Sequence, residues 1–99
     1  MDDRSLPAVD ASFVPVRSPD AYTVAIDGEA VLLDERENRL HLLNHSATLV
    51  WLCFDGHASI GELARELSEE LGAPYEALLG ETLTIVDDLR REGLLAGGR

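Results

Sequence analysis

Few residues in this sequence could hold a metal ion. The three histidines are His41, His45 and His57, and the first two stand four positions apart. That spacing places two imidazoles on one face of a helix, as in zinc-binding helices. The local pattern instead predicts that a strand changes into a helix between His41 and His45, so the helical spacing does not apply. We therefore expect no metal site, and no glycine-rich loop is present to bind a phosphate cofactor.

The potential nucleophiles are poor candidates for catalysis. Cys53 lies in an apolar stretch, and the nearest charge is the acidic side chain of Asp55, whereas a reactive thiolate needs positive charge nearby. The serines are few, and none lies in a G-x-S-x-G turn. The adjacent acid pairs Glu69-Glu70 and Asp87-Asp88 point in different directions on their helices and indicate solvated faces. No nucleophile is matched with a base and an orienting group, so we predict a binding protein and not an enzyme.

Three strands are predicted in the first half of the chain. Residues 22–26, 29–34 and 39–43 are rich in β-forming residues and are separated by turn signals. Asp27-Gly28 tolerates the positive φ of a two-residue hairpin turn, and residues 35–38 form a charged loop. The result is an antiparallel meander with the first and third strands at its edges.

Three helices follow. Asn44 is a good N-cap for the first, which carries an apolar stripe and ends at Asp55-Gly56. Ser59 and Glu62 form a capping box for the second. Further signals are the stop at Gly72, the start of the third helix at Pro74, its end near Glu92, and Leu94 and Leu95 returning to the core.

This order, β-β-β-α-α-α, predicts an α+β fold of the winged helix-turn-helix type, because the second and third helices are joined by a tight turn. The length of 99 residues suits one domain. We assign the domain to residues 22–96 and expect residues 1–21 to form a loosely ordered N-terminal tail.

The charge of the chain limits its partners. The formal net charge is −11, from 8 basic residues, all arginine, and 19 acidic residues. Such a surface repels phosphate and anionic lipid, which argues against nucleic-acid and membrane partners. With no signal peptide and no apolar run of about 20 residues, a cytoplasmic location is expected. An acidic winged-helix regulator, acting through DNA or another protein, is the alternative function, although the third helix exposes more acids than arginines.

The third strand, RLHLL at residues 39–43, is short, apolar and at a sheet edge. An open edge presents backbone N–H and C=O groups to water or to a partner. An extended peptide could add there as a fourth strand. Two alternatives remain open at this point: Arg39 and His41 only keep the edge solvated, or the edge serves self-association.

Residues 22–96 resemble the PqqD family. The resemblance is carried by the order and spacing of several short features: Leu43-Asn44, Ala47, Trp51, Asp55-Gly56, Ile60-x-x-Leu63 and the closing LRREGLL at residues 89–95. Members of that family are peptide chaperones, also called RiPP recognition elements, in pathways for ribosomally synthesised and post-translationally modified peptides, such as pyrroloquinoline quinone and lasso peptides. They bind the leader region of a precursor peptide and deliver it to a modifying enzyme, often a radical SAM protein or a leader peptidase.

The resemblance also implies a site. The leader would pair with the third strand, at Arg39, Leu40, His41, Leu42 and Leu43. The opposite wall of the groove would come from one face of the third helix, at Leu79, Leu83, Val86, Asp87 and Arg90. On this view Asp87 meets a basic leader residue and Arg90 an acidic one. The family has no catalytic residues to carry over.

Overall fold

The strands come first and form one antiparallel sheet. In the computed structural model, which describes residues 9–96, the strands are β1 (Ala21–Ile26), β2 (Glu29–Asp34) and β3 (Arg39–Leu43), in the order β1-β2-β3. Asp27 and Gly28 have φ of 52° and 81°, so the predicted two-residue turn between β1 and β2 is confirmed. The strands at the two edges are β1 and β3, as expected.

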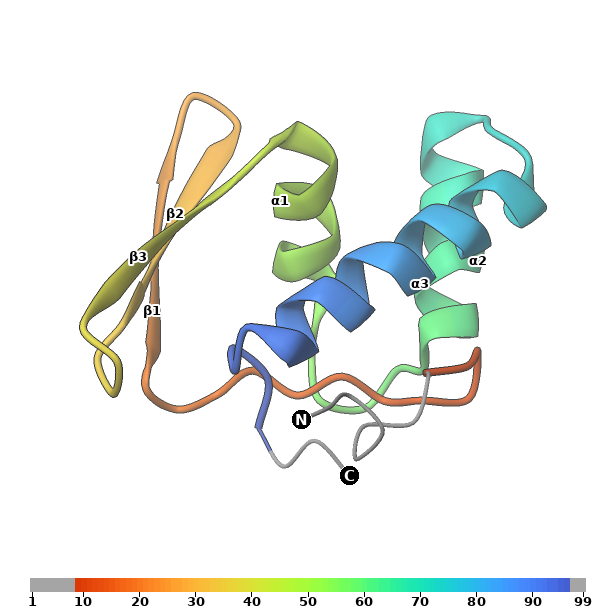
Figure 1. Ribbon diagram of the computed structural model, residues 1–99. Helices are drawn as coiled ribbons and strands as arrows, with labels where there is room; N and C mark the ends of the chain where they lie inside the picture. Colours follow the sequence, from red (N-terminus) through yellow and green to blue (C-terminus); the bar gives the residue numbers. More distant parts are fainter. Residues whose placement is uncertain (1–8, 97–99) are drawn as a thin grey trace.

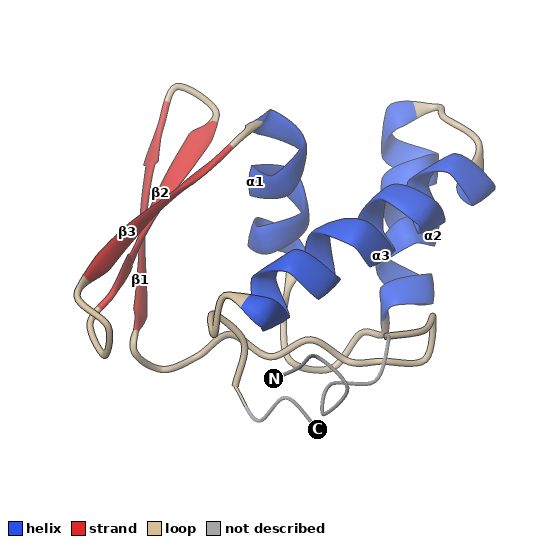
Figure 2. Cartoon of the chain, in the orientation of Figure 1, coloured by secondary structure: helices blue, strands red, loops and turns tan. Residues whose placement is uncertain are grey.

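The helices follow as α1 (His45–Cys53), α2 (Ile60–Leu71) and α3 (Tyr75–Arg91). Figure 1 shows α1 standing between the sheet and α2, while α3 crosses in front of α2 and runs on below α1 toward the sheet. All three helices lie on one side of the sheet (Figure 2). The predicted β-β-β-α-α-α order is therefore confirmed. No helix within residues 9–96 combines the length and the apolar character needed to cross a bilayer.

Two helix boundaries differ from the prediction. Pro74 is the N-cap of α3 and not its first residue, because its ψ of 136° is extended. The first helix stops at Cys53, before Asp55-Gly56, and the N–H of Phe54 donates to the carbonyl of Trp51. The carboxylate of Asp55 instead accepts from the N–H groups of His57 and Ala58, at 2.8 and 2.9 Å. It therefore organises the loop that leads to α2.

The core lies between the inner face of the sheet and the helices. Its central side chain is Trp51, which is fully buried and whose Nε1 donates to Thr23 Oγ1 of β1 at 2.8 Å. The guanidinium of Arg17 stacks on the indole ring at 5.0 Å and donates to the Trp51 carbonyl. Leu94 and Leu95 are buried, so the predicted return of the chain end to the core is confirmed.

The segment before β1 differs from the loose tail that the sequence predicted. The carbonyls of Ala11 and Phe13 accept from the N–H groups of Gly61 and Ile60, both at 2.9 Å. These donors open α2 and have no partner within the helix. A short antiparallel bridge joins Arg17 to Leu95. Residues 9–20 are thus packed on the domain, whereas residues 1–8 lie outside the described residues.

Candidate functional site

The site begins at the junction of β3 and α1, where a single residue separates strand from helix. Asn44 has extended backbone angles, and its Oδ1 accepts the N–H of Ala47 at 2.8 Å. This cap satisfies one of the orphan donors of the first turn. Because no loop intervenes, the end of β3 is held directly by the packed helix α1.

A second contact holds the same end of β3. The hydroxyl of Thr48, on α1, accepts from the N–H of Ala30 at 2.9 Å and donates to the carbonyl of Leu43 at 3.4 Å. Thr48 is 2% exposed, so this hydroxyl completes the β2–β3 ladder in the interior. Asn44 and Thr48 together fix where β3 stops.

The open edge of β3 is formed by Leu40 and Leu42. In a two-residue hairpin the residues flanking the turn, Ile26 and Glu29, form a hydrogen-bonded pair, and such pairs alternate along the ladder. On β2, Ala30, Leu32 and Asp34 therefore bond toward β3. Their partners in the register are Leu43, His41 and Arg39. The backbone groups of Leu40 and Leu42 consequently point away from β2, at an edge where no other described strand pairs.

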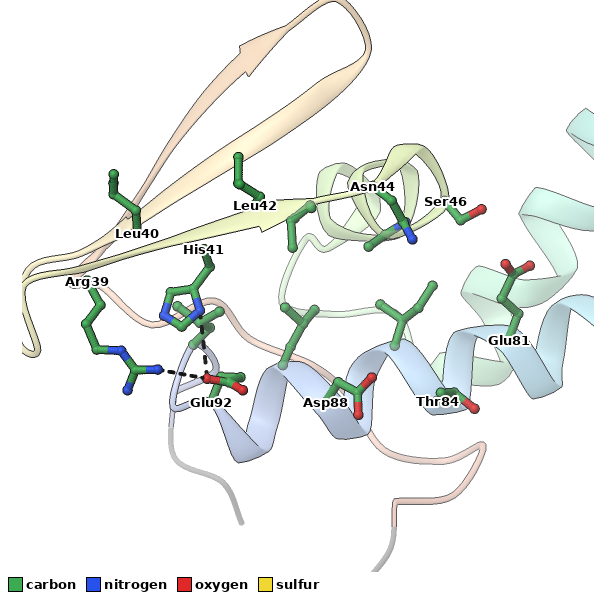
Figure 3. A pocket seen from close by; sticks show the side chains of 15 residues that line it. Arg39, Leu40, His41, Leu42, Asn44, Ser46, Glu81, Thr84, Asp88 and Glu92 are labelled. Carbon is green, nitrogen blue, oxygen red and sulfur yellow. Dashed lines mark hydrogen bonds and ion pairs between the residues drawn. The ribbon is translucent and has the colours of Figure 1, made fainter.

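A groove of about 720 Å³ lies along this edge, between β3 and α3. All five residues of β3 line it, together with the start of α1. The residues that α3 contributes are Glu81, Thr84, Ile85, Asp88 and Leu89, followed by Glu92 at its C-cap. Figure 3 shows the strand and the helix facing each other across this space.

The side chains of β3 divide between the two faces of the sheet. Leu40 and Leu42 are 68% and 83% exposed and point away from α3 (Figure 3). Arg39 and His41 point to the helix side, where Glu92 Oε1 lies 3.5 Å from an Arg39 guanidinium nitrogen and 3.8 Å from His41 Nδ1. The His41 side chain is only 12% exposed, so it is not the solvated residue that the sequence suggested.

Two further carboxylates face the groove from α3. Glu81 and Asp88 are exposed residues of its lining. Within residues 9–96, no hydrogen bond or ion pair engages either carboxylate. The helix wall is therefore acidic, and among the described residues Glu92 is the one of these three acids that has basic partners.

The α3 residues that were predicted for the groove wall lie elsewhere. Val86 is fully buried, and Leu79 and Leu83 pack against the core. Asp87 contacts Arg90 at 3.1 Å and Arg91 at 2.8 Å. The Arg91 hydrogen bond, with help from Arg90, holds the pKa of Asp87 below its usual value. The predicted roles of Asp87 toward a basic and Arg90 toward an acidic leader residue are not supported, because these two side chains bind each other and neither lines the groove.

The difference between the predicted residues and those that line the groove concerns the rotation of α3 and not its presence. The predicted residues lie on one face of α3 and the lining residues lie on another, and each set follows the 3.6-residue period of a helix. Periodicity alone cannot say which face turns toward β3, although the border of the buried stripe holds a signal. Apolar Ile85 and Leu89 stand next to the exposed residues Thr84 and Asp88. This pattern is expected of a helix face that lies partly in the core and partly at the surface.

The other candidate chemical groups are held apart. His45 Nδ1 lies 3.2 Å from the carbonyl of Gly28, whereas His41 faces Glu92, so the two histidines serve different contacts. Across the described part of the chain, no group of three or more His, Cys, Asp or Glu residues could hold a metal ion. Burial, reinforced by Glu66 and Glu70, raises the pKa of the Cys53 thiol, which disfavours the thiolate at neutral pH.

The fold and the sequence agree with one known family. Residues 29–95 match the sequence profile of the family described as coenzyme PQQ synthesis protein D (PqqD). The chain belongs to the PqqD family. That match spans β2, β3 and all three helices, and it includes every residue that lines the groove. A comparison with curated protein sequences finds no significant match.

Three solved structures have the same fold. TbiB1 in complex with the TbiA(beta) leader peptide has a TM-score of 0.74 and 18% identity, covering 83% of this chain and 95% of that one. Lasso peptide synthetase B1, complexed with the leader peptide, has a TM-score of 0.72 and 22% identity, covering 83% and 96%.

The third is the PqqD truncation of Methylobacterium extorquens PqqCD, described as a functional and stand-alone RiPP recognition element, with a TM-score of 0.75 and 20% identity, covering 89% and 95%. At these identities the likeness shows a shared fold. This likeness confirms the predicted fold, in which a three-stranded antiparallel sheet is followed by three helices.

Proposed function

We propose that this protein binds the leader region of a ribosomally synthesised precursor peptide and delivers it to a modifying enzyme. The observation that carries the proposal is the open backbone edge of β3, which faces a groove of about 720 Å³. The peptide would add to β3 as a fourth strand. Backbone hydrogen bonds would supply affinity, and the groove would select the side chains.

The two edges of the sheet are not equivalent. Both β1 and β3 are edge strands, but the groove runs along β3 and has no β1 residue in its lining. A peptide on β3 gains hydrogen bonds from Leu40 and Leu42 and also side-chain contacts with α3. On β1 it would gain backbone hydrogen bonds and contacts with the outer face but no contact with α3, so β3 is the favoured site.

The relatives support the same function. Two of the three solved structures of this fold are complexes with a leader peptide, and the third is described as a recognition element for such peptides. We place the present chain in the same role, with the chemistry supplied by a separate enzyme such as a radical SAM protein or a leader peptidase. The DNA-binding alternative is disfavoured because α3 exposes Glu81, Asp88 and Glu92, which would repel phosphate.

A titration of isotopically labelled protein with its precursor peptide tests this function. Amide NMR shifts should concentrate in β3 and in the part of α3 that lines the groove. The absence of shifts in both elements at millimolar peptide would overturn the proposal.

A proline substitution tests the strand-addition mode separately. Leu42→Pro removes a backbone donor that points toward the peptide, and the affinity should fall by about tenfold or more. Ala25→Pro is the matched control, because alternation directs the N–H of Ala25 to the open edge of β1. Equal affinities for the two variants would contradict binding at β3.

A further inference from the structure

The groove presents different chemistry on its two sides. An added strand would alternate its side chains between the outer face of the sheet and the side facing α3. The strand neighbours on the outer face are apolar, and the wall across the groove is acidic. This difference allows the pattern of the bound peptide to be inferred.

The outer face is a continuous apolar surface. The register places Tyr22, Leu33 and Leu40 in one row across the sheet, and Val24, Val31 and Leu42 in another. Tyr22, Val24, Leu40 and Leu42 are all more than half exposed. A fourth strand beside β3 extends both rows, so its outward side chains bury the most area if they are apolar.

The side of the added strand that faces α3 favours a long cationic side chain. The floor of the groove includes the apolar side chains of Ala47, Ile85 and Leu89, and its rim carries the carboxylates of Glu81 and Asp88. Arginine and lysine lay an aliphatic stem along apolar surface and keep the charge at the rim. An acidic side chain at the same position would face two carboxylates.

The existing basic residues do not neutralise this wall. Arg39 and His41 approach Glu92, at the end of the groove near the C-terminus of α3. Glu81 and Asp88 lie further toward its N-terminus, where the lining contains no arginine. The formal net charge of −11 adds a long-range attraction for a cationic peptide.

We propose that the groove selects an extended leader segment in which apolar residues alternate with arginine or lysine, the basic side chains facing Glu81 and Asp88. This inference rests on the proposed function and names the class of peptide that the site takes. Leu40 and Leu42 contact the apolar side chains of the peptide, and the carboxylates of α3 attract its basic side chains.

Three synthetic peptides test it: acetylated and amidated heptapeptides in which valine alternates with arginine, glutamine or glutamate. Binding is measured by isothermal titration with the full chain, with the precursor peptide as a fourth ligand. The arginine peptide should bind about tenfold more tightly than the glutamine peptide at low salt and lose this advantage as the salt rises. The glutamate peptide should bind most weakly.

Adjacent acids on α3 provide a matched pair of variants. Asp88→Asn removes a groove carboxylate and should weaken the arginine peptide by about threefold, with no effect on the glutamine peptide. Asp87→Asn makes the same chemical change one residue away and outside the groove, so it should leave both affinities unchanged. The charge reversal Asp88→Lys should shift the preference toward the glutamate peptide.

The outcomes separate the two proposals. Equal binding of the three heptapeptides, or equal effects of Asp87→Asn and Asp88→Asn, overturns the charge selection and leaves leader binding intact. Binding of the precursor without binding of the arginine peptide does the same. If neither the precursor nor any heptapeptide binds, the proposed function itself fails.

Discussion

At the scale of single residues, Thr48 shows how a side chain can complete a sheet. Its hydroxyl takes the place of a backbone partner for Ala30 and Leu43, in a position with 2% exposure. Replacing it leaves a buried N–H and a buried C=O without that partner, and such a loss is more costly than the loss of an exposed hydrogen bond.

Thr48→Val should therefore lower the free energy of unfolding by about 1–3 kcal/mol. The shape is conserved, so the loss reports the hydrogen bonds and not a cavity. Urea denaturation followed by circular dichroism measures it. Thr84→Val is the control, since the Thr84 hydroxyl is exposed and only donates back to the Gly80 carbonyl; its change should stay within about 0.5 kcal/mol. A Thr48→Val variant as stable as the original chain would show that the ladder does not depend on this hydroxyl.

The sequence predicted the residues of β3 but not this partner. Strand propensity and the turn signals at Asp27-Gly28 and residues 35–38 are local, and they were sufficient to place residues 39–43 at a sheet edge. The Ala30–Thr48 hydrogen bond spans 18 positions and requires α1 to be docked. No local pattern distinguishes such a threonine from any other threonine in a helix.

At the scale of elements, the starts of α1 and α2 were predictable because Asn44 and Ser59 satisfy backbone donors next to them in sequence. The rotation of α3 was not. Val86 and Leu89 fill the core, and the groove then receives the neighbouring face with Ile85 and Asp88. Which face turns inward depends on long-range packing against α2 and Phe13, and the 3.6-residue period alone does not specify that face.

Asn44→Ala should destabilise both elements that Asn44 joins. Loss of the cap should cost about 1 kcal/mol of unfolding free energy. Because no loop separates α1 from β3, amide hydrogen exchange should also accelerate at His41 and Leu43, whose N–H groups point toward β2. Asn44→Ser retains a capping oxygen and should keep both properties near those of the original chain.

Ser59→Ala provides the comparison on another helix. It removes the cap of α2 and should cost a similar unfolding free energy, while exchange in β3 stays unchanged. If Asn44→Ala and Ser59→Ala affect β3 equally, the direct junction does not hold the strand.

At the scale of the whole molecule, the dominant electrostatic property is self-repulsion. A formal net charge of −11 on 99 residues opposes compaction, and salt screens that repulsion. The thermal midpoint should rise by several degrees between about 20 and 200 mM NaCl, which corresponds to about 1 kcal/mol for a domain of this size.

The affinity for the arginine heptapeptide should change in the opposite direction over the same range, because salt also screens the attraction between peptide and groove. Calorimetry and titration on one protein preparation give both slopes. Slopes of the same sign would show that specific contacts, and not the net charge, control the response to salt.

The bridge between Arg17 and Leu95 has a consequence for how this domain can be built into larger proteins. Ser18 donates to the Leu94 carbonyl at 2.9 Å, and Ala96 donates to the Val16 carbonyl at 2.7 Å. Any protein fused to this domain therefore has to leave residues 94–96 in place, because they also hold the segment that leads into β1, and residues 9–16 continue from there to the start of α2.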